Sequence, residues 1–293
     1  MRRVRNLLGI PVTGWLCAGG SGLILTLGFA PFSQPVAGWI GLIPLAYYGQ
    51  RQQPDLRDSF LLGWFFGLSH FLTSLSWLQT VTLSGWAVLS AYLAVYPALW
   101  FVLWVRLAGS DPDRMTSGGN IRHAFFGACA WTVTEWLRGV VFSGFGWNSL
   151  GVSQGDLLLV AQVADLGGVL LVSWVVAFAG LTLTLTARRF ELEIRGSQKW
   201  RPRWDFTAGV VVVGLTMVYG ARTLLRPLPE PVVTLSYAAI QPSVPQDPWR
   251  SAKVSRVAGE LRKWSELALV GGGPVDLLVW PESLAGTGWR EEP

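Results

Sequence analysis

Glu282 is the acid in this sequence that is best placed for chemistry, because it directly follows the apolar run Leu277-Leu278-Val279-Trp280-Pro281. Such a run, closed by proline, predicts a strand buried in a sheet. Functional groups of α/β sheets gather at the carboxyl ends of strands, where desolvation makes a carboxylate a better general base. From spacing alone, a helix cap or a solvent-exposed acid is the simpler explanation of Glu282.

Glu135 and Arg138 form a second pair of interest, because they lie in an apolar stretch. Residues three apart share a helix face, so we expect the two side chains to pair. Ionisable groups within lipid are costly and often mark a site, here one that contacts lipid headgroups. An ion pair that holds two helices together explains them as well. Trp147, in the polar and Gly-rich segment 142–156, is expected near the membrane interface, in a connector that carries interfacial aromatics.

Few other residues suggest chemistry. Cys17 and Cys129 lie in apolar stretches and are expected to be packing residues. His70 and His123 are far apart and lack the spacing of metal ligands. His70 is expected to be a hydrogen-bonded packing residue rather than a proton relay. The sequence therefore predicts no metal and no cofactor.

The composition indicates that most of the chain lies in a membrane. The 293 residues are 51% hydrophobic and only 14% charged, whereas a soluble domain carries about 25% charged residues. A spanning helix needs about 20 mostly apolar residues. Seven segments are candidates, of which the second is short and rich in Gly and Pro: residues 7–30, 35–49, 59–83, 85–105, 123–142, 166–187 and 206–225.

The basic residues between these segments lie almost entirely on one side of the predicted membrane. That side holds Arg2, Arg3, Arg5, Arg51, Arg57, Arg106, Arg114, Arg122, Arg188, Arg189, Arg195, Lys199, Arg201 and Arg203, and the other side holds Arg138. This positive-inside pattern predicts a cytoplasmic N-terminus and an extracytoplasmic segment after residue 225. The net charge of +5 therefore reflects orientation in the lipid bilayer, and no nucleic-acid partner is expected.

The chain changes character after residue 225. Residues 226–231 are a Pro-rich linker. Residues 232–242 and 275–280 predict strands, and the intervening helix, Lys253 to Val270, is amphipathic. A strand, a helix and a strand in this order predict a βαβ unit with parallel strands. One face of the helix carries Leu261, Trp264, Leu267 and Ala268.

A series of short motifs, taken in order along the chain, resembles the bacterial apolipoprotein N-acyltransferase family. The motifs are LGFAPF at 27–32, LGWFFG at 62–67, EWLRG at 135–139, GVSQ at 151–154, AIQPSVPQ at 239–246 and VWPE at 279–282. Each motif is weak alone, but their order behind the apolar segments is specific. Trp249 is similar in position to a tryptophan that the family places after its Pro-Gln step.

The resemblance implies a polytopic α-helical membrane bundle in residues 1–225, the linker 226–231, and the start of a nitrilase-like (carbon–nitrogen hydrolase) α/β sandwich in residues 232–293. It implies transfer of a fatty acyl group from a phospholipid donor to the N-terminal diacylglyceryl-cysteine amine of an apolipoprotein, through a cysteine thioester. Glu282 matches the general base of the family's Glu, Lys and Cys set. The substrate-binding candidates are Trp249, Glu135, Arg138 and Trp147. The bacterial inner membrane, with a periplasmic C-terminal domain, is the expected location.

The family's lysine and nucleophilic cysteine would follow Glu282, and residues 283–293 contain neither. We therefore expect the chain to be the amino-terminal part of an acyltransferase and to be inactive alone. Two alternatives stay open: a transporter or lipid-binding membrane protein without catalysis, and another membrane-tethered nitrilase-like amidase. No internal repeat typical of a transporter is evident.

Overall fold

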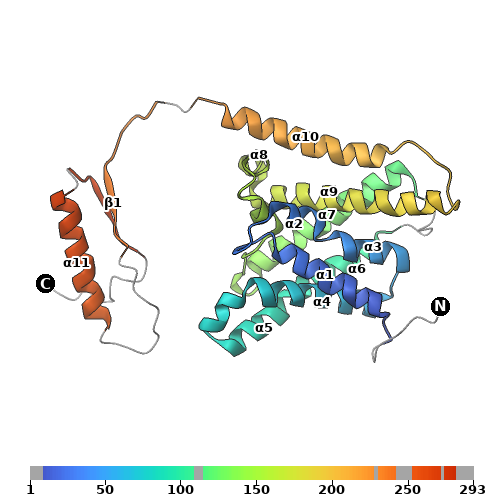
Figure 1. Ribbon diagram of the computed structural model, residues 1–293, viewed down its shortest axis with the longest axis horizontal. Helices are drawn as coiled ribbons and strands as arrows, with labels where there is room; N and C mark the ends of the chain where they lie inside the picture. Colours follow the sequence, from blue (N-terminus) through green and yellow to red (C-terminus); the bar gives the residue numbers. More distant parts are fainter. Residues whose placement is uncertain (1–8, 109–114, 228–229, 242–252, 272–273, 282–293) are drawn as a thin grey trace. The chain divides into compact units, whose positions relative to one another are not determined.

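The computed structural model describes residues 9–108, 115–227, 230–241, 253–271 and 274–281. The chain divides into two compact units, Met1–Arg226 and Pro227–Pro293. The first unit is helical, and the second contains a parallel pair of strands with one helix (Figure 1).

The first half of the helical unit consists of short to medium helices. Polar side chains start three of them: Asp55, Thr82 and Thr116 each accept a hydrogen bond from the backbone N–H three residues later. Such N-caps satisfy donors that have no partner within the helix. The helices are α1 (Val12–Thr26), α2 (Pro35–Ile40), α3 (Ile43–Gln52), α4 (Leu56–Ser74), α5 (Leu83–Leu93), α6 (Val95–Arg106) and α7 (Ser117–Val140), with the 3-10 turn η1 (Ser76–Thr80) after α4.

The second half of this unit contains the longest helix. Two 3-10 turns, η2 (Val141–Ser143) and η3 (Leu150–Gln154), and the short helix α8 (Leu158–Ala161) lead from α7 into α9 (Ala164–Ile194). The helix α10 (Trp204–Leu224) then lies beside α9 (Figure 1). Near its start, α9 is broken at Gly167 and Gly168, where the φ angle of Gly168 is +67°. A Cβ at Gly168 would meet nothing within 4 Å, so that glycine serves the backbone break rather than close helix packing.

Glycines at close helix contacts and buried tryptophans both contribute to the core of the bundle. A Cβ added at Gly63 would lie 2.7 Å from the Cα of Ala98 in α6, and one added at Gly67 would lie 2.6 Å from the Cα of Ala94, directly before α6. The backbone of α4 therefore contacts the backbone at the start of α6. Small residues at helix crossings permit this approach in membrane proteins. Trp100 and Trp104 of α6 are fully buried, and their indole N–H groups donate to backbone carbonyls of Gly127 and Ala46.

Three of the described helices are long and apolar enough to cross a membrane: Leu83–Arg106, which joins α5 and α6, together with α9 and α10. The first apolar helix, α1, has 15 residues. The expected span at 35–49 is instead two helices of 6 and 10 residues, neither of which is long enough to cross a bilayer alone. These three helices indicate a membrane protein. The count of seven spans stays a prediction.

The second unit contains β1 (Tyr237–Ala239), α11 (Lys253–Gly271) and β2 (Leu277–Val279). The strands are parallel, with Tyr237 opposite Leu277 and Ala239 opposite Val279, which confirms the predicted strand, helix and strand order. Leu261 of α11 is buried, whereas Trp264 and Leu267 are exposed, so half of the predicted apolar face is covered. Leu277 and Val279 are 51% and 43% exposed, so the expectation of a buried strand is wrong for the described residues.

Candidate functional site

The structure brings together three of the five residues predicted for the site. Glu135 and Arg138 lie in the last turns of α7, and Trp147 lies in the segment that follows. Glu282 and Trp249 lie outside the described residues. The chain segment 144–149 between η2 and η3, called the outer loop below, connects the three described residues.

Arg138 holds the outer loop by its backbone. Its Nη1 atom donates to the carbonyl oxygens of Phe145, at 3.0 Å, and Trp147, at 2.5 Å, and its Nη2 atom lies 3.4 Å from Ser149 Oγ. The Phe145 N–H donates back to the Arg138 carbonyl at 2.8 Å. The side chain is 2% exposed, and its guanidinium lies over the Phe71 ring, 5.3 Å from the centroid. A planar guanidinium can reach several acceptors at once, which suits this task.

Glu135 holds the end of the same loop. Its Oε1 atom accepts from the Leu150 N–H at 2.6 Å, and the residue is 6% exposed. The expected pairing with Arg138 is limited to electrostatic attraction, because the hydrogen bonds of the two side chains go to different backbone atoms. The Trp131 indole and the Ser173 hydroxyl lie near the carboxylate, but Oε2 has no hydrogen bond of good geometry.

The backbone of this region is strained. Phe142, Ser143 and Asn148 have φ angles of +51°, +72° and +56°, and Gly144 has +76°. Non-glycine residues with such angles cost of order 1–3 kcal/mol each and persist where the surroundings determine them. The hydrogen bonds from Arg138 and to Glu135 hold the backbone of this region in these angles. Strain held by buried charged groups favours a positioned loop over a plain connector.

The segment after the outer loop returns into the bundle, contrary to its predicted role as an exposed connector. Gln154 is fully buried, accepts from Trp39 Nε1 at 2.8 Å and donates to the Pro35 carbonyl at 2.9 Å. The Gly151 N–H donates to Ser173 Oγ at 2.8 Å. The polar residues of the GVSQ motif therefore form hydrogen bonds inside the bundle. In the sequence, the motif was the one signal that they could be buried.

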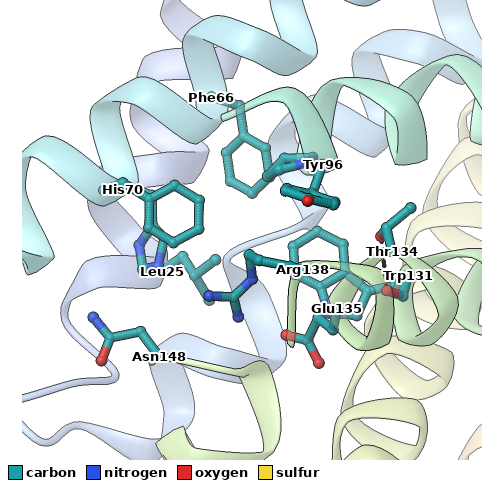
Figure 2. Close-up of a pocket in the computed structure, with 11 residues that line it drawn as sticks. Leu25, Phe66, His70, Tyr96, Trp131, Thr134, Glu135, Arg138 and Asn148 are labelled. Atoms are coloured by element: carbon teal, nitrogen blue, oxygen red, sulfur yellow. Dashed lines mark hydrogen bonds between the residues drawn. The ribbon is translucent and has the colours of Figure 1, made fainter. Parts of the chain in front are cut away.

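An inner cavity lies below the outer loop, between α4, α6 and α7. Its lining includes His70, Trp131, Glu135, Arg138 and Asn148, and Figure 2 shows His70, Asn148 and Glu135 around the Arg138 guanidinium. His70 is 3% exposed, and its Nδ1 atom lies 3.1 Å from Thr26 Oγ1, as expected for a hydrogen-bonded packing residue. Its Nε2 atom, however, is buried without a partner. An unpaired buried polar group costs about 1–3 kcal/mol.

An outer cavity of about 660 Å³ lies on the other side of Asn148. Its walls are the outer loop, η3 and the segment after α1, with Phe29, Trp147 and Asp156 among the lining residues. Trp147 is 57% exposed, and its ring lies 5.3 Å from that of Trp77. This volume is within the range of small-molecule sites. Arg138 of α7 thus binds the loop that lines the outer cavity, but does not line the cavity itself.

A second buried charged cluster, which the sequence did not indicate, lies at the other end of α7. Arg189 was expected in a loop after residue 187, but α9 continues to Ile194 and Arg189 is fully buried. Its Nε donates to Glu193 at 3.1 Å, and its Nη1 donates to Ser117 at 2.8 Å and lies 3.5 Å from Asp205 Oδ1. Asp205 Oδ2 accepts from Asn120 at 2.5 Å, and Glu193 Oε2 accepts from Arg203 at 2.6 Å.

Metal chemistry has no candidate ligands in the part of the chain that the structure describes, where no three His, Cys, Asp or Glu side chains gather. Cys17 and Cys129 are both free thiols, in α1 and α7. The site is therefore built from hydrogen bonds, aromatic rings and two buried charged groups.

Comparison with known proteins matches the chain to one family. The family described as apolipoprotein N-acyltransferase N-terminal domain matches residues 21–182, more than half of the chain. The chain is 31% identical to an apolipoprotein N-acyltransferase of Geobacter metallireducens, over 99% of this chain and 55% of that protein. It is 30% identical to one of Rhodopseudomonas palustris and 32% identical to one of Methylococcus capsulatus, over 90% and 89% of this chain. The chain spans about half the length of the curated relatives it matches.

Proposed function

We infer the function from the family, since the chain belongs to the apolipoprotein N-acyltransferase N-terminal domain family. We propose that it serves in the transfer of a fatty acyl group from a phospholipid to the N-terminal diacylglyceryl-cysteine amine of an apolipoprotein. The observation that carries this proposal is the alignment of 99% of the chain with a relative of that name. The described site adds an open cavity bordered by aromatic rings at one end of a helical membrane bundle.

The proposed topology follows the positive-inside pattern. The N-terminus lies in the cytoplasm, seven segments cross the inner membrane, and residues 232–293 begin a nitrilase-like domain on the periplasmic side. In this arrangement α2 and α3 together form the second crossing. The outer cavity then opens toward the periplasm, where lipoprotein acceptors are anchored.

The proposed chemistry is a two-step transfer with Glu282 as the general base. A cysteine thiolate of the nitrilase-like domain attacks the phospholipid ester carbonyl and expels the lysophospholipid, which leaves a thioester. The acceptor amine then attacks the thioester, forms the amide and releases the thiolate. Glu282 accepts the thiol proton and returns it to the alkoxide of the leaving lysophospholipid, and in the second step it accepts a proton from the attacking amine. A lysine of that domain stabilises the oxyanion. Cys17 and Cys129 are not this nucleophile, because they lie in α1 and α7.

We assign different roles to the three described candidates. Trp147 lines the outer cavity and is the residue that contacts lipid. Glu135 and Arg138 are positioning residues, because Arg138 binds the outer loop, Glu135 binds Leu150 directly after it, and neither borders that cavity. Trp249 stays a proposed substrate contact by resemblance alone.

A chimera tests the function. Residues 1–293 replace the aligned part of the Geobacter metallireducens relative, and the purified chimera in lipid nanodiscs is given a phospholipid and a diacylglyceryl-cysteine peptide. We expect mass spectrometry to detect the N-acylated peptide and a thioester-linked acyl group on the protein. Glu282→Gln should abolish both products. Glu266→Gln, a change at an exposed acid of α11, is the matched control and should retain them.

The chimera would contradict the proposal if it folded, bound phospholipid and still transferred nothing. Transfer that persists in Glu282→Gln would leave the family function in place but would remove Glu282 as the base.

A further inference from the structure

The inner cavity has unusual lining for the interior of a membrane bundle. Its cavity volume is about 20 Å³, and its lining includes His70, Trp131, Glu135, Arg138 and Asn148. His70 and Glu135 are 3% and 6% exposed, so their polar atoms have little access to bulk solvent. Any partner for these atoms has to be inside the cavity.

Three buried polar atoms on these residues have no hydrogen bond of good geometry: His70 Nε2, Trp131 Nε1 and Glu135 Oε2. The Trp131 indole lies near the Glu135 carboxylate but is not well aligned with it, so a water between them would complete the bonding of both. Buried polar groups in native proteins are nearly always paired, with protein or with ordered water. Three exceptions on the lining of one cavity point to a common occupant rather than to three separate defects.

The hydrogen-bonding capacities of the three atoms are complementary to water. We assign His70 the tautomer in which Nδ1–H donates to Thr26 Oγ1 at 3.1 Å, while the Thr26 hydroxyl donates to the Gly22 carbonyl at 3.0 Å. In this tautomer Nε2 is an acceptor. Glu135 Oε2 is a second acceptor, and the Trp131 indole is a donor. Water can donate to two groups and accept from a third, which is what this lining offers.

The cavity also has the right size. A buried water needs a cavity of about 10–15 Å³ and two to four polar partners, and the inner cavity has a volume of about 20 Å³. We propose that the inner cavity is a permanent hydration site, in which water donates to His70 Nε2 and Glu135 Oε2 and accepts from Trp131 Nε1. The bound water lets Glu135 and Arg138 remain buried without pairing with each other. This inference does not depend on the reaction in which the chain takes part.

Asn148 supplies the connection to the outside. It lines both the inner cavity and the outer cavity, and its backbone is held in the left-handed region with φ of +56°. Water therefore exchanges between the site and the outer cavity past the Asn148 amide. The outer loop, which Arg138 holds, is the cover of the hydration site.

The core offers an internal control. Trp100 and Trp104 are 0% exposed and Trp131 is 5% exposed, so all three are buried. The indole N–H groups of Trp100 and Trp104, however, donate to carbonyls at 3.1 Å and 3.0 Å, and neither residue lines the inner cavity. Radiolysis of bound water produces hydroxyl radicals in place, and these oxidise an adjacent indole. In the full chain in nanodiscs, we expect X-ray footprinting to oxidise Trp131 several-fold faster than Trp100 and Trp104. Equal protection of the three tryptophans would overturn the proposal.

A pair of substitutions tests the role of His70. His70→Gln keeps a polar group and should retain rapid oxidation of Trp131, whereas His70→Leu should slow it to the rate of Trp100. An unchanged rate in a folded His70→Leu protein would mean that radicals reach Trp131 from bulk solvent, and the hydration site would be rejected. If His70→Leu does not fold, the comparison of the three tryptophans in the unaltered protein still decides.

Discussion

A buried charged cluster lies at each end of α7, and the two clusters differ in how completely their polar atoms are hydrogen-bonded. At one end, Arg189 binds both Glu193 and Asp205, and every side-chain nitrogen of Arg189 and every carboxylate oxygen of the two acids has a partner. At the other end, Glu135 and Arg138 bind backbone atoms of a strained loop and leave polar atoms unpaired. Asn120 and Glu135 mark the two ends, about 22 Å apart along the helix.

We propose that this difference separates a structural cluster from one that serves the function. A closed network of charges fixes α7, α9 and α10 together and has no capacity left for a ligand. A cluster that holds a loop and borders the inner cavity has such capacity. We therefore expect substitutions at the Arg189 end to affect folding, and substitutions at the Arg138 end to affect activity more than folding.

Arg189→Met is expected to have the largest effect on stability. Removal of one partner leaves buried carboxylates uncompensated, which costs about 3–5 kcal/mol. The measurement is the thermal midpoint of the protein in detergent. Arg189→Met combined with Asp205→Asn restores the charge balance and should recover part of the loss. Arg262→Met, at an exposed ion pair of α11, should leave the midpoint unchanged.

If the double substitution were no better than Arg189→Met alone, charge balance would not be the reason for the network.

Arg138→Lys is expected to have a smaller effect on stability, about 1–3 kcal/mol, because hydrogen bonds from a charged donor to the loop carbonyls are lost. A single ammonium group cannot reach Phe145, Trp147 and Ser149 together as the guanidinium does. Acyl transfer by the chimera should fall strongly, while the protein remains folded. A Lys variant with full transfer would show that the loop keeps its shape without the guanidinium.

Gly144→Ala tests the strained backbone of the outer loop. A Cβ there would lie 2.0 Å from the Gly139 carbonyl oxygen, at a φ of +76°. We expect a loss of about 1–3 kcal/mol from such strain, together with faster cleavage of the loop by protease. Gly146→Ala is the matched control, since its Cβ would meet nothing within 4 Å. Similar behaviour of the two variants would mean that the loop is not held.

Tyr219→Phe should have the smallest effect. The Tyr219 hydroxyl donates to both oxygens of Asp165 at 2.6 Å and 2.7 Å, but this hydrogen bond is exposed and therefore contributes little to stability. Neither the thermal midpoint nor acyl transfer should change measurably. A large loss in either quantity would mean that the ends of α9 and α10 are coupled to the site more closely than the two-cluster account allows.

The sequence predicts the fold best where a local pattern determines it. The position of α10 and the order of β1, α11 and β2 follow from residue periodicity and turn residues, and so does the start of α9 but not its end. Residues 35–49 were not predicted well, because apolar composition does not reveal that the chain breaks after Ile40 into two short helices.

Burial of polar residues was the hardest property to predict. Arg189 was counted as a loop residue because basic residues next to a span usually lie in water, and its partners Asp205 and Asn120 are distant in sequence. Gln154 and Ser153 made their segment look like a surface connector, although both are buried. Glu135 and Arg138 were identified because a charge in an apolar stretch is conspicuous, but their loop partners could not be inferred from spacing.

One comparison tests the separation of roles most directly: acyl transfer and thermal midpoint measured side by side for the chimeras carrying Arg138→Met and Arg189→Met. We predict that Arg138→Met loses transfer at a temperature at which it is still folded, and that Arg189→Met loses transfer only as it unfolds. If the loss of transfer followed the loss of folded protein equally in both variants, the outer loop would be a structural element and the proposed positioning role of Arg138 would be wrong.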